Sequence, residues 1–168
     1  INSGIAHQHA AGDYNTRRRE CEQACGLLGV KLLRHLEVQD LPRIEKLPEP
    51  LNRRVRHVLT ENARVVDAVE AMRTNDLNRL GQLFNASHDS QRDNYAVSIP
   101  AIDLLVDLAH KDPDVYGARL TGGGFGGSIV VLARGGSGRA AALRIVKAYE
   151  RESGNRATIL ATLTGQRN

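Results

Sequence analysis

The stretch GARLTGGGFGG, residues 117–127, decides how the last third of this chain folds. Five of the six residues from Gly122 to Gly127 are glycine, so this part of the backbone carries almost no side chains. Aliphatic and β-branched residues stand on both sides of it, in 115–121 and 128–133. Because such residues favour strands and glycine favours tight turns, we predict two neighbouring strands joined by a glycine turn.

The glycine turn could serve two purposes. Backbone N–H groups that are not screened by side chains can surround an anion such as phosphate. Equally, glycine permits a tight hairpin or close packing against another part of the backbone. The glycines by themselves do not separate these two interpretations.

Three known phosphate-binding motifs can be compared with the glycine turn. Gly122, Gly124 and Gly127 have the spacing of the dinucleotide motif, but that motif must open a helix, and 128–132 is a predicted strand. The protein-kinase glycine loop does join two strands, yet none of the other protein-kinase motifs follows it here. No Gly-x-x-x-x-Gly-Lys-Ser/Thr sequence occurs, which excludes a Walker P-loop.

Helices are predicted for most of the remaining chain, from apolar residues that recur at intervals of three and four. Their ranges are about 13–28, 51–75, 77–92, 98–110 and 139–151. Gly29 is expected to end the first helix, and Ser98 to cap the fourth. We predict a connector with one short helical turn at 30–50, part of a strand at 1–9, and a last strand at 157–163. The fold class is therefore α+β, with helices packed on a small, mostly antiparallel sheet.

The third predicted helix has a long apolar face. Its members are Val55, Val58, Leu59, Val65, Val66, Val69 and Met72, and Asn62 alone interrupts them. This spacing predicts an amphipathic helix that turns the whole face toward the core.

The length and composition are those of a folded domain. The 168 residues are 41% hydrophobic and 25% charged, which is enough for a hydrophobic core. No apolar run approaches the roughly 20 residues of a membrane span, and we expect no secretory signal. The two cysteines, Cys21 and Cys25, suit a reducing compartment. Because the chain begins with Ile1 rather than Met, we expect it to be part of a longer protein.

The net charge of +4 raises the possibility of a nucleic-acid surface. Arginines cluster at 17–19 and 53–56, but acidic residues are interleaved with them along the same predicted helices. The six aromatic residues form no base-stacking pattern. We therefore expect both arginine clusters to be solvated helix faces and expect no nucleic-acid partner.

Two histidines and the two cysteines could be imagined as a zinc site. His7 and His9 would share one face of a strand, and Cys21 and Cys25 one face of a helix. Their spacing matches no standard zinc finger, and cysteines are often small buried hydrophobes. We expect no metal site in this chain.

Three stretches together resemble one protein family. GARLTGGGFGG at 117–127 resembles the third motif of the GHMP kinases. DYNTRRRECE at 13–22 and NASHDSQRDNYAVS at 85–98 are similar to segments of the galactokinases within that superfamily. The matches follow the family's order and span the chain from Asn2 to about Leu163. The resemblance implies a GHMP kinase C-terminal domain over 1–168, with a ferredoxin-like antiparallel sheet packed against helices.

The resemblance also implies an activity. Galactokinases transfer a phosphoryl group from MgATP to the anomeric hydroxyl of galactose, and a cytoplasmic enzyme is expected. Their phosphate loop, sugar signature and catalytic aspartate belong to an N-terminal lobe, and no such sequence occurs here. We therefore expect that lobe of the same protein to hold most of the ATP and Mg²⁺. We expect no catalytic residue in this chain, and no activity from the chain alone.

The resemblance assigns roles to a few residues of this chain. Tyr14 matches the tyrosine whose phenol reaches the sugar. Ala6 stands where a basic residue is usual, which keeps open the alternative of a non-catalytic sugar-sensing or regulatory module. The residues expected to support the phosphate loop are Thr121, Gly122, Gly123, Gly124, Gly126 and Gly127.

Overall fold

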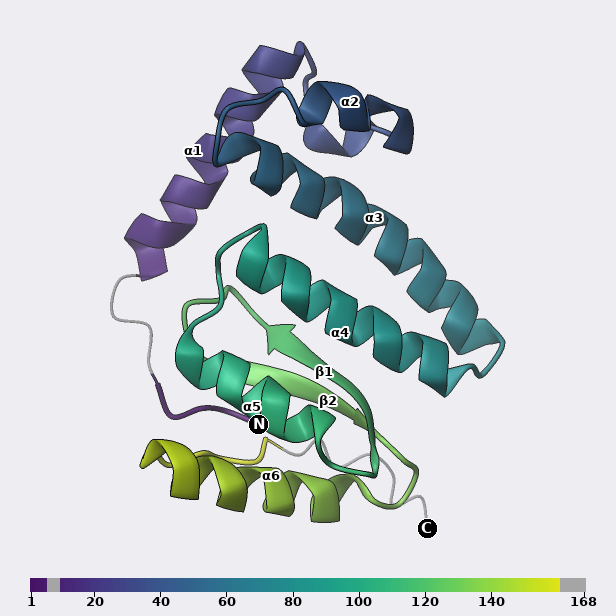
Figure 1. Cartoon of the computed structure of the whole chain (residues 1–168), viewed down its shortest axis with the longest axis vertical. Helices are drawn as coiled ribbons and strands as arrows, with labels where there is room; N and C mark the ends of the chain where they lie inside the picture. The colour runs from purple at the N-terminus through teal and green to yellow at the C-terminus, as the bar shows by residue number, and fades with distance from the viewer. Residues whose placement is uncertain (6–9, 161–168) are drawn as a thin grey trace. The chain divides into compact units, whose positions relative to one another are not determined.

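The computed structural model describes residues 1–5 and 10–160 of the chain, although not the side chains of Ala10 and Ala11. The chain divides into two compact units. Residues 8–97 form one, here called the helical unit, and residues 1–7 with 98–168 form the other, the sheet unit. Figure 1 shows the helices of the first and the strand pair of the second. The α+β class predicted from the sequence is confirmed.

The helical unit is built on three long helices, α1 (Ala10–Leu28), α3 (Leu51–Arg73) and α4 (Leu77–Asp93). Gly29 ends α1 as predicted. It has a positive φ of 66°, its N–H bonds to Gly26 O at 3.3 Å, and the N–H of Val30 bonds to Cys25 O at 3.1 Å. This pair of bonds satisfies carbonyl groups that the end of a helix otherwise leaves without partners.

The connector between α1 and α3 is more helical than predicted. It contains the 3₁₀ helices η1 (Leu33–His35) and η2 (Val38–Asp40) and the short helix α2 (Leu41–Ile44). The single helical turn expected there is therefore wrong. The reason is packing, because this segment supplies four residues of the unit's core, namely Leu33, Leu36, Ile44 and Leu47.

The apolar face of α3 is divided between core and surface. Its first half is buried against α1 and the connector, with Leu51, Val55 and Leu59 in the core. Its second half is exposed, since the exposed fraction is 48–69% for each of Val65, Val66, Val69 and Met72. The prediction that the whole face points inward is wrong for this half. The spacing of the apolar residues identified the apolar face of α3. It did not show how much of that face the neighbouring helices cover.

The sheet unit contains α5 (Pro100–His110), β1 (Val115–Thr121), β2 (Ser128–Ala133) and α6 (Gly138–Ser153). β1 and β2 pair antiparallel, and Thr121 lies opposite Ser128 at the glycine turn. Ser98 does not cap α5 as predicted. Ile99 occupies the N-cap, and the Ser98 hydroxyl donates a hydrogen bond to Asp103 instead.

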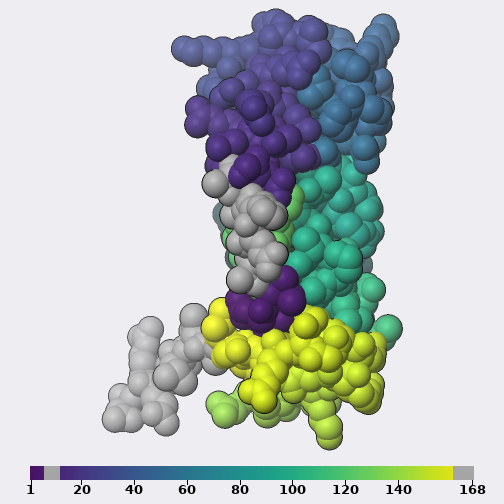
Figure 2. Space-filling view, turned by 90° about the vertical axis from the view of Figure 1, so that its left-hand side faces the viewer, coloured from purple at the N-terminus to yellow at the C-terminus, as the bar shows by residue number. Residues whose placement is uncertain are grey.

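The first residues of the chain extend this sheet. Asn2 forms antiparallel bridges with Ser128 on one side and Thr158 on the other. Figure 2 shows the dark purple start of the chain lying against the yellow segment that follows α6. Of the predicted last strand at 157–163, the structure has this bridge at Thr158, and residues 161–163 lie outside the described part.

The core of the sheet unit lies between its helices and the strand pair. α5 contributes apolar side chains that recur at intervals of three and four, as predicted, and α6 contributes Ile145 and Tyr149. The Tyr149 ring is fully buried, and its hydroxyl donates to Ser3 O at 3.1 Å, which satisfies its polar end. The other buried hydrophobic residues of this core are Ile102, Leu105, Val106, Leu108, Ala109, Ala118, Leu120, Ile129 and Ala141.

Candidate functional site

The glycine turn connects β1 to β2 with an unusual run of backbone angles. φ is positive at Gly122 (89°), Gly124 (83°), Gly126 (132°) and Gly127 (80°). Phe125, between them, also has a positive φ of 58°. Side chains rarely tolerate such angles, so the run explains why this segment is almost all glycine.

Gly126 is fixed by sterics as well as by its φ. A Cβ atom at this position would lie 2.8 Å from Ile5 O and 3.8 Å from Ile99 Cδ1. Backbone hydrogen bonds hold the same approach in place: Gly127 N–H donates to Ile5 O at 3.2 Å, and Ser3 N–H donates to Gly127 O at 2.8 Å. The close packing that the sequence allowed is therefore present on this side of the turn.

The other side of the turn is open. Thr121, Gly122 and Gly123 are exposed, and a Cβ at Gly122 or Gly123 would meet nothing within 4 Å. Residues 121–128 contain no carboxylate and no histidine. The turn can thus present backbone N–H groups to an anion. Its side chains include no carboxylate or imidazole that could act as a general base, and no carboxylate that could bind a hard cation.

Tyr14 lies in the first turns of α1, in the helical unit. Its side chain is 61% exposed, so its ring is available to a ligand rather than packed at the helix start. A phenol of this kind offers an apolar ring and a hydroxyl, which suits the mixed surface of a sugar.

The two arginine clusters, at 17–19 and 53–56, are not uniformly solvated, contrary to the prediction. Arg18 does form an exposed pair with Glu22 at 2.9 Å. In contrast, the side chain of Arg17 is 14% exposed and that of Arg54 only 5%. Both contact the Glu20 carboxylate, at 3.1 and 2.8 Å respectively.

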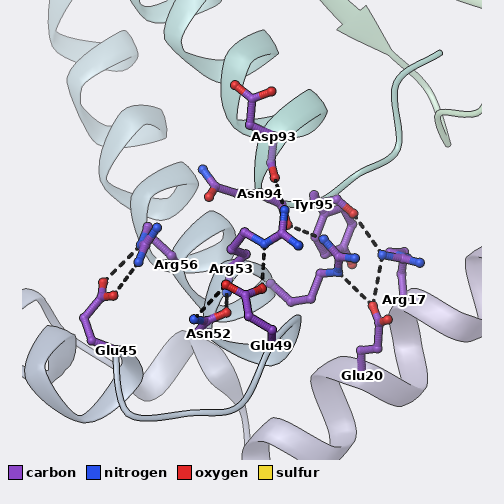
Figure 3. Close-up of polar contacts among 11 residues, drawn as sticks. Arg17, Glu20, Glu45, Glu49, Asn52, Arg53, Arg56, Asp93, Asn94 and Tyr95 are labelled. Atoms are coloured by element: carbon purple, nitrogen blue, oxygen red, sulfur yellow. Dashed lines mark hydrogen bonds and ion pairs between the residues drawn. The ribbon is translucent and has the colours of Figure 1, made fainter.

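A polar network extends from this carboxylate, and Figure 3 shows its members. Arg54 donates to Asn94 O at the end of α4, and Arg17 donates to Tyr95 O at 3.4 Å. The more exposed Arg53 pairs with Glu49 at 2.7 Å and reaches Asp93 O at 3.2 Å. The network therefore ties α1 to both α3 and the end of α4.

His57 is a further buried polar group that the sequence did not single out. Its ring stacks on Tyr95 with centroids 4.4 Å apart, and its Nδ1 shares a 2.9 Å hydrogen bond with Ser90 Oγ. Burial disfavours the charged imidazolium and lowers the pKa of His57 to about 4. His57 is thus neutral at physiological pH. The one sequence signal was its place among the apolar residues of α3.

The histidines considered for a zinc site, His7 and His9, lie outside the described residues, as does Ala6. Within residues 1–5 and 10–160, no group of three or more His, Cys, Asp or Glu side chains is arranged to hold a metal ion. No helix in the same ranges is long and apolar enough to cross a membrane.

The sequence of this chain matches a known protein family. The family described as GHMP kinases C terminal matches residues 68–151, half of the chain, and this range includes the glycine turn. The chain belongs to the GHMP kinase family. Among its GHMP relatives, the galactokinase of Haemophilus influenzae is 43% identical over 171 residues, covering 99% of this chain and 44% of that protein. The galactokinase of Mannheimia succiniciproducens is 46% identical over 138 residues, covering 79% of this chain and 36% of that protein.

Solved structures of GHMP kinases agree with this assignment. The crystal structure of Lactococcus lactis galactokinase complexed with galactose matches with a TM-score of 0.86 and 30% identity. The matched region covers 94% of this chain and 42% of the Lactococcus lactis chain. The L. major mevalonate kinase in complex with R-mevalonate matches less closely, with a TM-score of 0.57 and 26% identity over 88% of this chain and 36% of that one. The resemblance to galactokinases predicted from the sequence is confirmed, and the chain spans less than half the length of these relatives.

Proposed function

We propose that residues 1–168 act as the C-terminal lobe of a galactokinase-like sugar kinase. The complete enzyme would transfer a phosphoryl group from MgATP to the anomeric hydroxyl of galactose, in the cytoplasm. The observation that carries the proposal is the glycine turn, which is pinned from behind at Gly126 and open at Gly122 and Gly123. The similarity to galactokinases over nearly the whole chain supports it.

In this proposal the turn braces the phosphate loop supplied by the N-terminal lobe. Phosphoryl transfer depends on holding the reacting groups in line and neutralising charge, so a rigid backbone wall beside the phosphates favours the reaction. Residues 121–128 bring no carboxylate. In this proposal the ligands of Mg²⁺ and the catalytic base belong to the N-terminal lobe. Tyr14 would contact the sugar through its exposed phenol.

A chimera tests the proposal directly. The matching C-terminal part of the Haemophilus influenzae galactokinase is replaced by this chain, and galactose-dependent ADP release is measured. We expect activity from the chimera and none from this chain alone. A chimera that folds, as judged by circular dichroism and size-exclusion chromatography, but stays inactive would contradict the proposal.

Two variants of the chimera test the residue roles. Tyr14→Phe removes only the hydroxyl, so we expect a higher KM for galactose with an unchanged KM for ATP. Gly126→Ala disturbs the turn, so we expect a lower kcat. Activity of the isolated chain, in turn, would overturn the assignment of the catalytic groups to the other lobe.

A further inference from the structure

A cavity of about 440 Å³ lies within the helical unit, between α1, the η1 segment, α3 and the end of α4. Leu33 and Val58 supply apolar wall, and Tyr95 supplies an aromatic ring. Tyr14, proposed above to contact the sugar, also lines it. Of the charged residues in the lining, Arg18 is already paired with Glu22. This volume is within the range of small-molecule pockets, which run from roughly 300 to 1,000 Å³.

Both cysteines of the chain line this cavity. Cys21 and Cys25 are free thiols, each half-buried, and they lie four residues apart on α1. Residues at this spacing share one face of a helix, with Cβ atoms about 5–6 Å apart. Cys21 Sγ lies 3.8 Å from the hydroxyl of Tyr95, which lines the same cavity.

The spacing of the two thiols disfavours a disulfide. A disulfide needs Cβ atoms about 3.5–4.5 Å apart, closer than i and i+4 positions of a helix allow. A bridge through one additional atom spans a longer distance without distorting the helix. Zinc is a poor candidate for that atom, because structural zinc takes four protein ligands, and the described residues contain no group of three.

We propose that Cys21 and Cys25 form a chelating site for an organic trivalent arsenical, with its apolar substituent in the adjoining cavity. An arsenic(III) centre is soft and binds thiolate sulfur, and it needs only two protein ligands when it keeps its carbon substituent. The cavity predicts a preference for an aryl compound over inorganic arsenite. The inference does not depend on the proposed kinase function.

The binding step balances without an oxidant. The arsenic–oxygen bonds of an aryl arsenoxide break and two arsenic–sulfur bonds form. The two thiol protons leave with the oxygen as one molecule of water, and arsenic stays trivalent. Burial raises the pKa of both thiols, so single-thiol alkylating reagents, which need the thiolate, are expected to react slowly at neutral pH.

Phenylarsine oxide is the probe that tests the site. We expect one equivalent to consume both thiols of the whole chain and to add the mass of one phenylarsenic group less two hydrogens. A competing small dithiol should reverse the addition. Cys21→Ser and Cys25→Ser should each weaken binding by roughly 100-fold or more, because each removes the chelate. Circular dichroism checks that both variants fold.

The role of the cavity is tested separately. Inorganic arsenite lacks the phenyl group and is expected to bind more weakly, by up to about tenfold, because burial of an aromatic ring favours binding. Val58→Thr keeps the shape of the cavity wall but makes it polar. It should therefore weaken the binding of phenylarsine oxide and leave the binding of arsenite unchanged. Equal binding of both compounds to the native chain would overturn the role of the cavity. Uptake of two equivalents, or tight binding by either serine variant, would overturn the chelate.

Discussion

The polar groups buried around Arg54 in the helical unit and around Ser3 in the sheet unit are satisfied by different means. The helical unit uses side chains: the Arg54 guanidinium is shared between Glu20 and Asn94 O, and His57 bonds to Ser90. In the sheet unit, Ser3 relies on the backbone: it is buried, its N–H donates to Gly127 O, and its carbonyl accepts from Tyr149. The buried Asp112 of the same unit is instead paired with the Arg144 side chain at 2.7 Å. Removing one charged side chain should destabilise the first kind of arrangement, whereas adding a side-chain atom where the backbone packs closely should destabilise the second. The following variants test this difference.

The largest effect is expected from Arg54→Ala. It leaves Glu20 in a largely buried place with Arg17 as its remaining partner, and it leaves Asn94 O without its guanidinium donor. Breaking a buried ion pair in this way costs about 3–5 kcal/mol, which we expect to appear in the free energy of unfolding measured with urea. The matched control is Arg53→Ala, one residue earlier on α3. Its 2.7 Å pair with Glu49 is largely exposed, so a loss of at most about 1 kcal/mol is expected.

In the sheet unit, adding one methyl group at the glycine turn should cost nearly as much. Gly126→Ala brings a Cβ within 2.8 Å of Ile5 O and forces a side chain into a φ of 132°. Strain and overpacking together predict a loss of about 2–4 kcal/mol, measured by thermal unfolding. Gly123→Ala adds the same methyl group to open space, and it should change stability by less than about 1 kcal/mol. Equal losses in the two variants would contradict the steric account of the turn.

A smaller loss is expected from Tyr149→Phe. The variant keeps the buried ring and removes the hydroxyl that donates to Ser3 O at 3.1 Å. Removing one partner of a buried hydrogen bond costs about 1–2 kcal/mol. Chemical denaturation of the native chain and the variant measures the difference. Tyr116→Phe on β1 serves as the control, and a loss there equal to that at Tyr149 would show that the bond to Ser3 is not the cause.

The smallest effect is expected near neutral pH, between pH 7 and pH 6, from the titration of His57. Burial of His57 lowers its pKa to about 4, although Glu61 opposes this shift and Arg64 and Arg54 reinforce it. The unfolded chain, with a histidine pKa of about 6.5, therefore binds more protons than the folded chain between pH 4 and 6.5. Stability from this group is complete above pH 6.5 and is lost as the pH falls toward 4. Between pH 7 and pH 6 the loss should be about 0.5–1 kcal/mol.

Urea unfolding at several pH values measures this dependence. His57→Gln removes the titrating group, so the variant should show a shallower loss of stability between pH 6.5 and 4. The same slope in the variant and the native chain would assign the pH dependence to other groups.

The sequence predicted the features that depend on neighbouring residues. The five long helices, the hairpin, the glycine turn and the cap at Gly29 all follow from spacing or from the conformational freedom of glycine. The burial of Arg54 could not be predicted, because its partners lie on α1 and at the end of α4. For the same reason, the spacing of apolar residues could not show that Val65 and Val69 are exposed.

The candidate site shows the same limit. The motif identified Tyr14 and the glycines of the turn, and their roles toward sugar and phosphate stay predictions. It did not show why Gly126 admits no side chain, because the obstructing atom belongs to Ile5 at the other end of the chain. The signal for His57 was weaker still, since a histidine among the apolar residues of a helix usually indicates packing.

The pairing of residues 1–5 with β2 has a consequence for the order of events during synthesis. Residues 8–97 are contiguous, so the helical unit can form from contacts within a segment already made, and largely helical units of this kind fold rapidly. The sheet unit is split around it, and Asn2 must wait for Ser128 and Thr158 to leave the ribosome. Closing so long a loop is slow. We therefore expect the sheet unit, including the glycine turn that contacts Ile5 and Ser3, to reach its final form after the helical unit.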